Sequence, residues 1–159
     1  ELIECQSTGP SACKYQNVSR ARFEGVELNG GLKPIPYTTL ELGYINLSAR
    51  NEKTGAQLFN RSRNAVKSKL TWDYTPLGLN FTTRVRWDEG FGAVDSNRNG
   101  RIQPNEKADP TVQIDLRLAK ELWKHASVHF GIDNLLDDTQ ATFRRTPGRV
   151  FYGGFTVKY

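Results

Sequence analysis

The sequence predicts an all-β fold, an antiparallel transmembrane β-barrel, from three observations. Apolar and polar side chains alternate along successive segments with a period of two residues, not the 3.6 of a helix. The connections between these segments are alternately long and short. Aromatic residues stand near both ends of the segments. A membrane barrel shows all three features, because lipid meets every second strand residue and headgroups meet both rims.

The alternation is clearest in segments 66–74, 79–88, 112–118, 128–133 and 150–159. Over these segments one face has 22 positions and no charged residue, whereas the other has 20 positions and ten Asp, Lys or Arg. With a quarter of all residues charged, 22 uncharged positions would arise by chance only about twice in a thousand. The two faces therefore meet different solvents. The charged face carries Lys67, Lys69, Asp73, Arg84, Arg86, Asp88, Asp115 and Arg117.

Two earlier segments, 21–33 and 37–50, alternate less cleanly, and Glu24 falls on the apolar side of the first. Residues 1–5 fit the end of a preceding strand. The prediction is seven strands and a stub.

Long and short connections alternate strictly along the chain, which places the short turns at one rim and the long loops at the other. This layout is typical of outer-membrane barrels, where the short turns are periplasmic and the long loops extracellular. Pro and Gly in the short turns support the assignment. The long connections are about 6–20, 51–62, 92–110 and 138–148, and the short ones are 34–36, 75–78 and 124–126.

Aromatic residues are placed as two interfacial girdles would require. Those near the short turns are Trp72, Tyr74, Trp123 and Tyr159, and those near the long loops are Trp87, Phe91 and Phe151.

Composition alone suggests a polar soluble domain, since the mean hydropathy is −0.59 and no stretch nears the roughly 18 apolar residues of a membrane helix. A membrane β-barrel is compatible with this composition, because only alternate residues of each strand face lipid and need to be apolar. The net charge of +5 would permit nucleic-acid binding, but no basic cluster or binding motif supports it, so we expect no nucleic-acid partner. The chain has no Met, which suggests a piece of a longer protein.

The two cysteines, Cys5 and Cys13, enclose seven residues that include Gly9 and Pro10. This short polar loop favours a disulfide and an oxidising compartment; two free thiols are the alternative.

One long connection carries a twelve-residue calcium-loop pattern, D-x-N-x-N-G-x-I-x-x-x-E. Gly100 would allow the sharp turn. Only two of the side-chain ligands are carboxylates, so any calcium binding should be weak, and a polar, turn-rich loop is the alternative. The expected ligands are Asp95, Asn97, Asn99, Arg101 through its carbonyl, and Glu106.

Four stretches together resemble TonB-dependent outer-membrane receptors. They are Tyr15–Glu27, Leu58–Ala65, the segment Phe-Gly-Ile-Asp-Asn-Leu-Leu-Asp-Asp at 130–138, and Pro147–Tyr159. The stretch from Cys13 to Glu27 is closest to the catecholate and colicin-receptor branch. The resemblance covers 13–159 in the order of the family. It implies that 1–159 is the C-terminal part of one barrel domain, the last seven or eight of 22 strands.

The resemblance also implies a function. Such receptors are not enzymes; they import scarce nutrient chelates, typically ferric siderophores, across the Gram-negative outer membrane with energy from TonB. The implied partners are outer-membrane lipid, the plug domain and the remaining strands, TonB, a siderophore-type ligand and the barrel-assembly machinery. Phe155, Val157 and Tyr159 would form the assembly signal, where Tyr159 replaces the commoner Phe, and the C-terminus would be periplasmic.

Alternative functions are a free-standing eight-stranded barrel with a structural or adhesion role and a soluble β-sandwich binding module. The charged face would contact the plug and guide the substrate, or would only be solvated.

Overall fold

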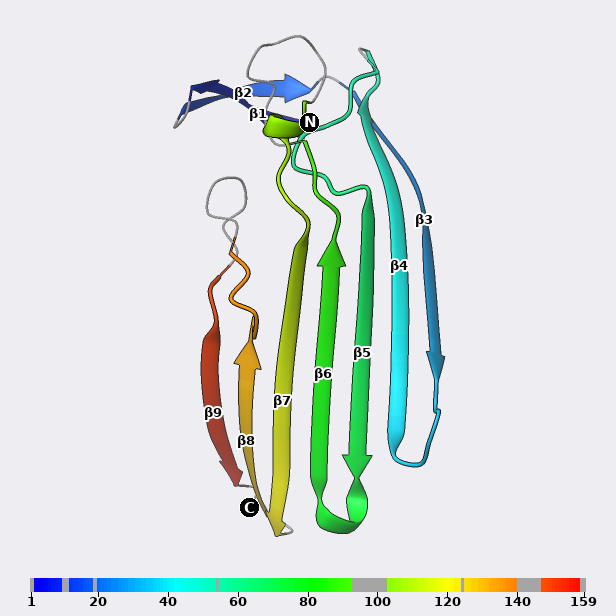
Figure 1. The fold of residues 1–159 in the computed structure, drawn as a ribbon, viewed down its shortest axis with the longest axis vertical. Helices are drawn as coiled ribbons and strands as arrows, with labels where there is room; N and C mark the ends of the chain where they lie inside the picture. Colours follow the sequence, from blue (N-terminus) through cyan, green and yellow to red (C-terminus); the bar gives the residue numbers. More distant parts are fainter. Residues whose placement is uncertain are drawn as a thin grey trace. The chain divides into compact units, whose positions relative to one another are not determined.

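The structure, a computed structural model, describes residues 2–9, 12–18, 20–53, 55–92, 103–123, 125–139 and 147–157, with the backbone alone for the first two ranges. The described residues form an all-β fold, as predicted (Figure 1). The strands are β1 Leu2–Gly9, β2 Ala12–Val18, β3 Ala21–Leu32, β4 Thr38–Asn51, β5 Asn64–Tyr74, β6 Leu79–Asp88, β7 Thr111–Trp123, β8 Ala126–Asp133 and β9 Val150–Val157. Two short 3-10 helices are η1 Thr75–Leu77 and η2 Pro104–Glu106.

Strands β3 to β9 form one seven-stranded sheet in which sequence neighbours are also spatial neighbours. This order confirms the seven predicted strands, and the bounds of β6 coincide with the prediction. Sequential antiparallel pairing needs only hairpin connections, because each strand returns beside the one before it. No helix in the described residues is long and apolar enough to cross a membrane.

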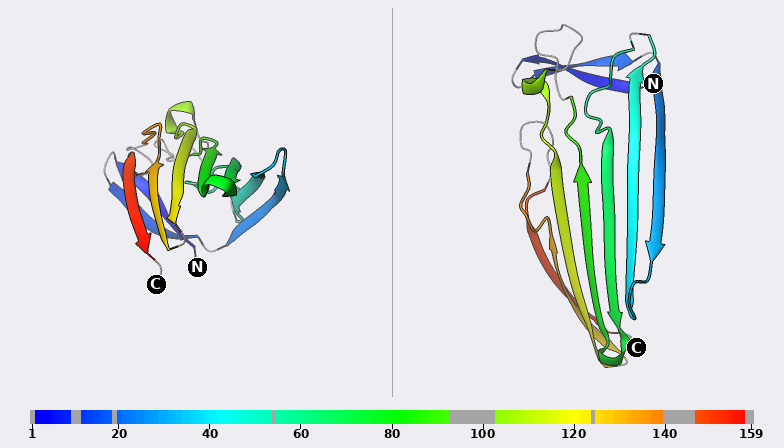
Figure 2. Two further views of the ribbon diagram at one scale, coloured as in Figure 1. Left: turned by 90° about the horizontal axis from the view of Figure 1, so that it is seen from below. Right: turned by 45° about the vertical axis from the view of Figure 1, so that its right-hand side comes forward.

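The chain divides into two compact units. Unit 1 comprises Glu1–Glu27, Ile45–Ala65 and Asp88–Pro110, and unit 2 comprises Leu28–Tyr44, Val66–Trp87 and Thr111–Tyr159. Within unit 2 the three short turns lie at one end of the strands (Figure 1). Figure 2 shows from two further sides that the strand segments of unit 2 keep their sequence order.

The first predicted long connection is wrong. Residues 2–9 and 12–18 pair as an antiparallel hairpin that forms a separate two-stranded sheet, so the strand expected to end at residue 5 extends to Gly9 and pairs with β2. A strand with polar residues at both alternate sets of positions has no amphipathic period, and this hairpin is of that kind.

Strand β7 continues to Trp123, which is five residues past the clear alternation of 112–118 and directly before the predicted short turn at 124–126. At Lys120 a cationic residue falls on the apolar face. In the structure the Lys120 Nζ donates a hydrogen bond to the carbonyl of Leu77 in the neighbouring short turn. A long cationic side chain can lie along an apolar face and place its charge at the rim, so the strand need not end there.

Glu24, on the apolar side of β3, is also accommodated by a partner for its charge. The Arg22 Nε donates to the Glu24 carboxylate at 2.8 Å, and both side chains are well exposed. Two residues apart on one strand face, they balance each other's charge.

Large apolar side chains remain exposed along one face of the sheet. Val128, Phe130 and Phe155 on β8 and β9 are between 41% and 62% exposed, although strands of a soluble protein would bury them. The opposite face of these two strands has rings lying over glycines. A Cβ at Gly131 would overlap the Tyr152 ring, and one at Gly154 would overlap the His129 ring. The outer face is thus left for an apolar solvent.

One residue of the two predicted aromatic girdles, Phe91, is buried in the structure. Near the short turns Trp72 and Tyr74 stack with ring centroids 5.3 Å apart, and Tyr37 meets Tyr74 edge-on at 5.2 Å. Near the long connections Phe151 is exposed, but Phe91 is 6% exposed and therefore buried within unit 1. Phe91 therefore belongs to the core of unit 1 and not to the predicted aromatic girdle.

Candidate functional site

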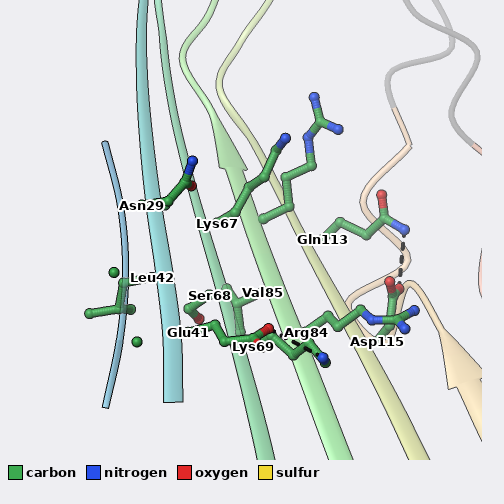
Figure 3. Close-up of a pocket in the computed structure, with 14 residues that line it drawn as sticks. Asn29, Glu41, Leu42, Lys67, Ser68, Lys69, Arg84, Val85, Gln113 and Asp115 are labelled. Atoms are coloured by element: carbon green, nitrogen blue, oxygen red, sulfur yellow. Dashed lines mark hydrogen bonds and ion pairs between the residues drawn. The ribbon is translucent and has the colours of Figure 1, made fainter. Parts of the chain in front are cut away.

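The candidate site is the polar face of β3 to β7, which surrounds a cavity of about 800 Å³ in unit 2 (Figure 3). Five neighbouring strands line it, and the charged lining residues stand at alternate positions, as the period of two predicts. We call this set the polar wall: Asn29, Gly31, Glu41, Gly43, Lys67, Lys69, Arg84, Arg86, Gln113 and Asp115.

Backbone hydrogen bonds at the strand ends fix which wall residues lie side by side. Between β4 and β5, the Leu47 N–H donates to the Arg63 carbonyl and the Asp73 N–H donates to the Tyr37 carbonyl. The two residue numbers add up to 110 in both pairs, so the register is the same at both ends of the strand pair. In an antiparallel ladder such bonded residues are directly opposite. Glu41 therefore faces Lys69.

The next two pairings follow in the same way. The Glu89 N–H donates to the Asn64 carbonyl, which sets the β5–β6 register. The Ala108 N–H donates to the Phe91 carbonyl and the Glu121 N–H to the Gly78 carbonyl, which sets the β6–β7 register. The wall therefore consists of two adjacent rows across the strands. The paired row is Gly31, Glu41, Lys69, Arg84 and Asp115, and the cationic row is Asn29, Gly43, Lys67, Arg86 and Gln113.

The paired row has balanced charges. Lys69 Nζ lies 3.2 Å from the Glu41 carboxylate, and Arg84 lies directly opposite Asp115 by register. In Figure 3 the Arg84 side chain extends toward Asp115. The two acids, Glu41 and Asp115, therefore flank the two cations of the row.

The cationic row has no acidic member. Lys67 and Arg86 are directly opposite each other, with Gly43 on the other side of Lys67 and Gln113 beyond Arg86. Among the described residues no carboxylate lies within ion-pair distance of Lys67. The register thus places two cationic side chains, Lys67 and Arg86, directly opposite each other.

Asn134 forms a hub just after β8. Its side-chain amide donates to the Pro147 carbonyl at 2.9 Å and to the Asp138 carbonyl at 3.3 Å, while its Oδ1 accepts the Asp138 N–H at 3.1 Å. The side chain is 4% exposed and the backbone is left-handed, with φ of 52°. Its own N–H donates to the Asp115 carboxylate at 3.0 Å. The hub ties the end of β8 to β7 and to the approach to β9.

A second polar cluster lies within unit 1. The Asn46 amide donates to the Asn64 Oδ1 at 2.7 Å, and the Asn64 N–H donates to the Glu89 carboxylate at 3.1 Å. These residues lie in β4, at the start of β5 and directly after β6, so the cluster crosslinks three chain segments. Neither cluster was predicted from the sequence, although Asn134 stands inside one of the family-like stretches.

The predicted calcium loop lies mostly outside the described residues, which include neither Asp95, Asn97 and Asn99 nor Arg101. Its last position, Glu106, is described and is 1% exposed. Its carboxylate accepts the Gln103 N–H at 2.9 Å as part of a capping box on η2. The final ligand of the pattern is therefore held in place by the local backbone.

The predicted disulfide falls on the hairpin whose backbone alone is described. Cys5 is paired with Tyr15 and Cys13 with Ser7, so the two cysteines are diagonal neighbours. Diagonal Cα atoms are about 7–8 Å apart in an ideal ladder, near the limit for a disulfide, and a register irregularity follows Ser7. The disulfide stays a prediction.

The predicted assembly signal is described at two of its three positions. Phe155 is 62% and Val157 57% exposed, on the same apolar face of β9, and Tyr159 lies outside the described residues. Its role in assembly also stays a prediction.

A sheet with one apolar exposed face and one charged wall is the structure of a transmembrane β-barrel wall. A family model for TonB dependent receptor-like β-barrels matches residues 2–135. The chain therefore belongs to the TonB-dependent receptor β-barrel family, whose members are transporters of the Gram-negative outer membrane and not enzymes.

Solved structures show the same fold. The ferric enterobactin receptor PfeA from Pseudomonas aeruginosa (mutant G324V) is 23% identical, with a TM-score of 0.73 over 92% of this chain and 24% of its own. The copper transporter OprC is 18% identical, with a TM-score of 0.72 over 99% and 26%. The siderophore receptor PirA from Acinetobacter baumannii is 14% identical, with a TM-score of 0.70 over 99% and 26%. The chain thus spans about a quarter of these receptors.

Proposed function

We propose that this chain supplies barrel wall and extracellular loops to an outer-membrane receptor that imports a scarce nutrient chelate, a ferric siderophore, with energy from TonB. The proposal rests on the match of the chain to the family model, which agrees with a sheet that has one apolar and one charged face. Structural neighbours that are siderophore receptors support the substrate class. In the complete receptor the polar wall would face the plug domain and the solvated lumen.

The proposal includes an orientation. The short turns and the C-terminus would be periplasmic, and the long connections extracellular, because outer-membrane barrels have this asymmetry. The chain would then contact lipid through its apolar face, and would reach TonB only through a plug domain. The barrel-assembly machinery would recognise the C-terminal strand.

Uptake by cells tests the function. The full-length receptor would be expressed in a Gram-negative strain without other siderophore receptors, and uptake of radiolabelled ferric catecholate and hydroxamate siderophores would be measured with and without TonB. We expect TonB-dependent uptake of one class. Absence of uptake for every chelate, with the receptor present in the outer membrane, contradicts the proposal and favours the free-standing structural or adhesion barrel.

We also propose that the loop ending at Glu106 binds calcium weakly. The twelve-residue pattern supports this, and so does the buried, backbone-held carboxylate at its last position. Calorimetry on the full-length receptor should show a dissociation constant of roughly a millimolar or somewhat below, lost in Glu106→Gln. The exposed Glu52→Gln is the control. Absence of heat at millimolar calcium contradicts the proposal.

A further inference from the structure

A lysine stands on the apolar face of the sheet at the short-turn end of unit 2. Lys120 of β7 is paired with Val128 of β8, and Val128 with Phe155 of β9, so the three side chains share one face. Val128 is 41% and Phe155 62% exposed. The Lys120 Nζ donates a hydrogen bond to the Leu77 carbonyl in the turn between β5 and β6. This bond holds the ammonium at the rim, next to an exposed apolar surface.

The Lys120 ammonium can bind a further acceptor. It has three N–H donors, of which the Leu77 carbonyl takes one. Among the described residues no carboxylate lies within ion-pair distance of its Nζ. Glu121, the next residue along β7, is paired with Ser127 on the opposite face of the sheet. The free donors therefore suit an anionic oxygen that approaches from the apolar side.

A β-bulge brings Trp123 to the same apolar face. The β7–β8 register shifts by one residue between Glu121 and Trp123, so that Trp123 is paired with Ala126. Ala126 stands two residues before Val128 and is therefore on the apolar face, where its β9 partner Val157 is 57% exposed. Without the shift, Trp123 would lie on the charged face with Glu121. Trp123 is 67% exposed, and its indole N–H is a second donor at this rim.

We propose that Lys120 and Trp123 bind the headgroup of an anionic phospholipid, such as phosphatidylglycerol. The Lys120 ammonium donates to the phosphate, the Trp123 indole donates to the ester region, and the acyl chains lie along Val128 and Phe155. A lipid is the partner that meets a cation and an exposed apolar surface together, because the apolar face of a membrane barrel contacts lipid along its height. The inference goes beyond the proposed function, since it holds for any cargo.

Headgroup charge distinguishes this site from general contact with lipid. A lysine near an anionic lipid surface contributes a preference of about fivefold, whereas zwitterionic phosphatidylcholine has no net charge to attract it. Lys33 provides a matched control. It belongs to the same short-turn end of unit 2, but it lines a cavity of about 560 Å³ together with Thr39 and Asp73 of the charged face. Its removal changes the net charge of the receptor equally and leaves the apolar face intact.

Fluorescence quenching by brominated lipids tests the site in the full-length receptor. The receptor is placed in phosphatidylcholine vesicles that contain brominated phosphatidylglycerol or brominated phosphatidylcholine, and the signal of Trp123 is the difference from a Trp123→Phe variant. Brominated phosphatidylglycerol should bind beside Trp123 about fivefold more strongly than brominated phosphatidylcholine at low salt. The preference should fall to about one in Lys120→Gln, and should persist in Lys120→Arg and in Lys33→Gln.

Several results overturn the inference. Equal binding of both lipids beside Trp123 in the unmodified receptor removes the site. A preference that persists in Lys120→Gln assigns it to other cations, and equal losses in Lys120→Gln and Lys33→Gln show a diffuse surface charge. If Lys120→Gln does not reach the membrane, salt decides with the unmodified receptor: the preference should approach one at 1 M salt, and an unchanged preference refutes the site. Siderophore uptake is measured separately. Uptake without a lipid preference refutes this site alone, and a lipid preference without uptake refutes the proposed function.

Discussion

Replacement of Asn134 by Ala is expected to destabilise the receptor strongly. The expected loss of unfolding free energy can be summed from the contacts of the side chain and the backbone conformation. The side chain makes three hydrogen bonds, to the Asp138 N–H and carbonyl and to the Pro147 carbonyl, and it is 4% exposed. At about 1 kcal/mol net for each bond, their loss costs about 3 kcal/mol. The left-handed backbone costs Ala about 1 kcal/mol more. The expected total is about 4 kcal/mol.

A matched series separates the two contributions. Asn134→Gly keeps the backbone conformation without strain and should cost about 3 kcal/mol, since it loses only the side-chain bonds. Asn60 also has positive φ, 57°, but its side chain is exposed, so Asn60→Ala should cost only about 1 kcal/mol.

The assay is urea unfolding of the full-length receptor in lipid vesicles, followed by tryptophan fluorescence. The three variants should rank Asn134→Ala, Asn134→Gly, Asn60→Ala in decreasing loss of unfolding free energy. If Asn134→Ala costs no more than Asn60→Ala, the hub does not hold the end of β8, and the reasoning from its hydrogen bonds fails.

Three further predictions concern the sheet, the cysteines and the orientation. Gly131→Ala should destabilise by about 1–3 kcal/mol because its Cβ overlaps the Tyr152 ring, and should be tolerated in a Tyr152→Ala background; equal costs in both backgrounds contradict the contact. Thiol titration of the denatured receptor should show Cys5 and Cys13 reactive only after reduction, and reactive thiols without reductant refute the disulfide. With both cysteines changed to Ser, a membrane-impermeant maleimide should label Lys53→Cys in intact cells and Leu77→Cys only after lysis. Labelling of Leu77→Cys in intact cells reverses the orientation.

Alternation within each strand was enough to predict the sheet and its two faces. It failed where one residue breaks the period for a local reason. At Lys120 the alternation of β7 is broken, and the Leu77 carbonyl that accepts a hydrogen bond from the Lys120 Nζ belongs to another segment. Phe91 was placed at the lipid interface because sequence position near a strand end does not distinguish a girdle residue from a loop core.

The rows of the wall were only partly predictable. The short turn at 75–78 fixes the register of β5 on β6, so the pairing of Lys67 with Arg86 could have been found from the sequence. The pairing of Glu41 with Lys69 could not, because a long connection of residues 52–63 separates their strands and leaves the register open. The Asn134 hub depends on contacts with Pro147 and Asp138 across another long connection.

The central claim is that the two faces of the sheet meet lipid and a polar lumen, respectively. Site-directed spin labels on β8, from Ser127 to Ile132 with Gly131 left unchanged, in the full-length receptor test it most directly. Oxygen, which concentrates in lipid, should relax labels at Val128, Phe130 and Ile132 more strongly than labels at Ser127 and His129, with a period of two residues. An accessibility profile without this alternation, or with the opposite phase, would contradict the account.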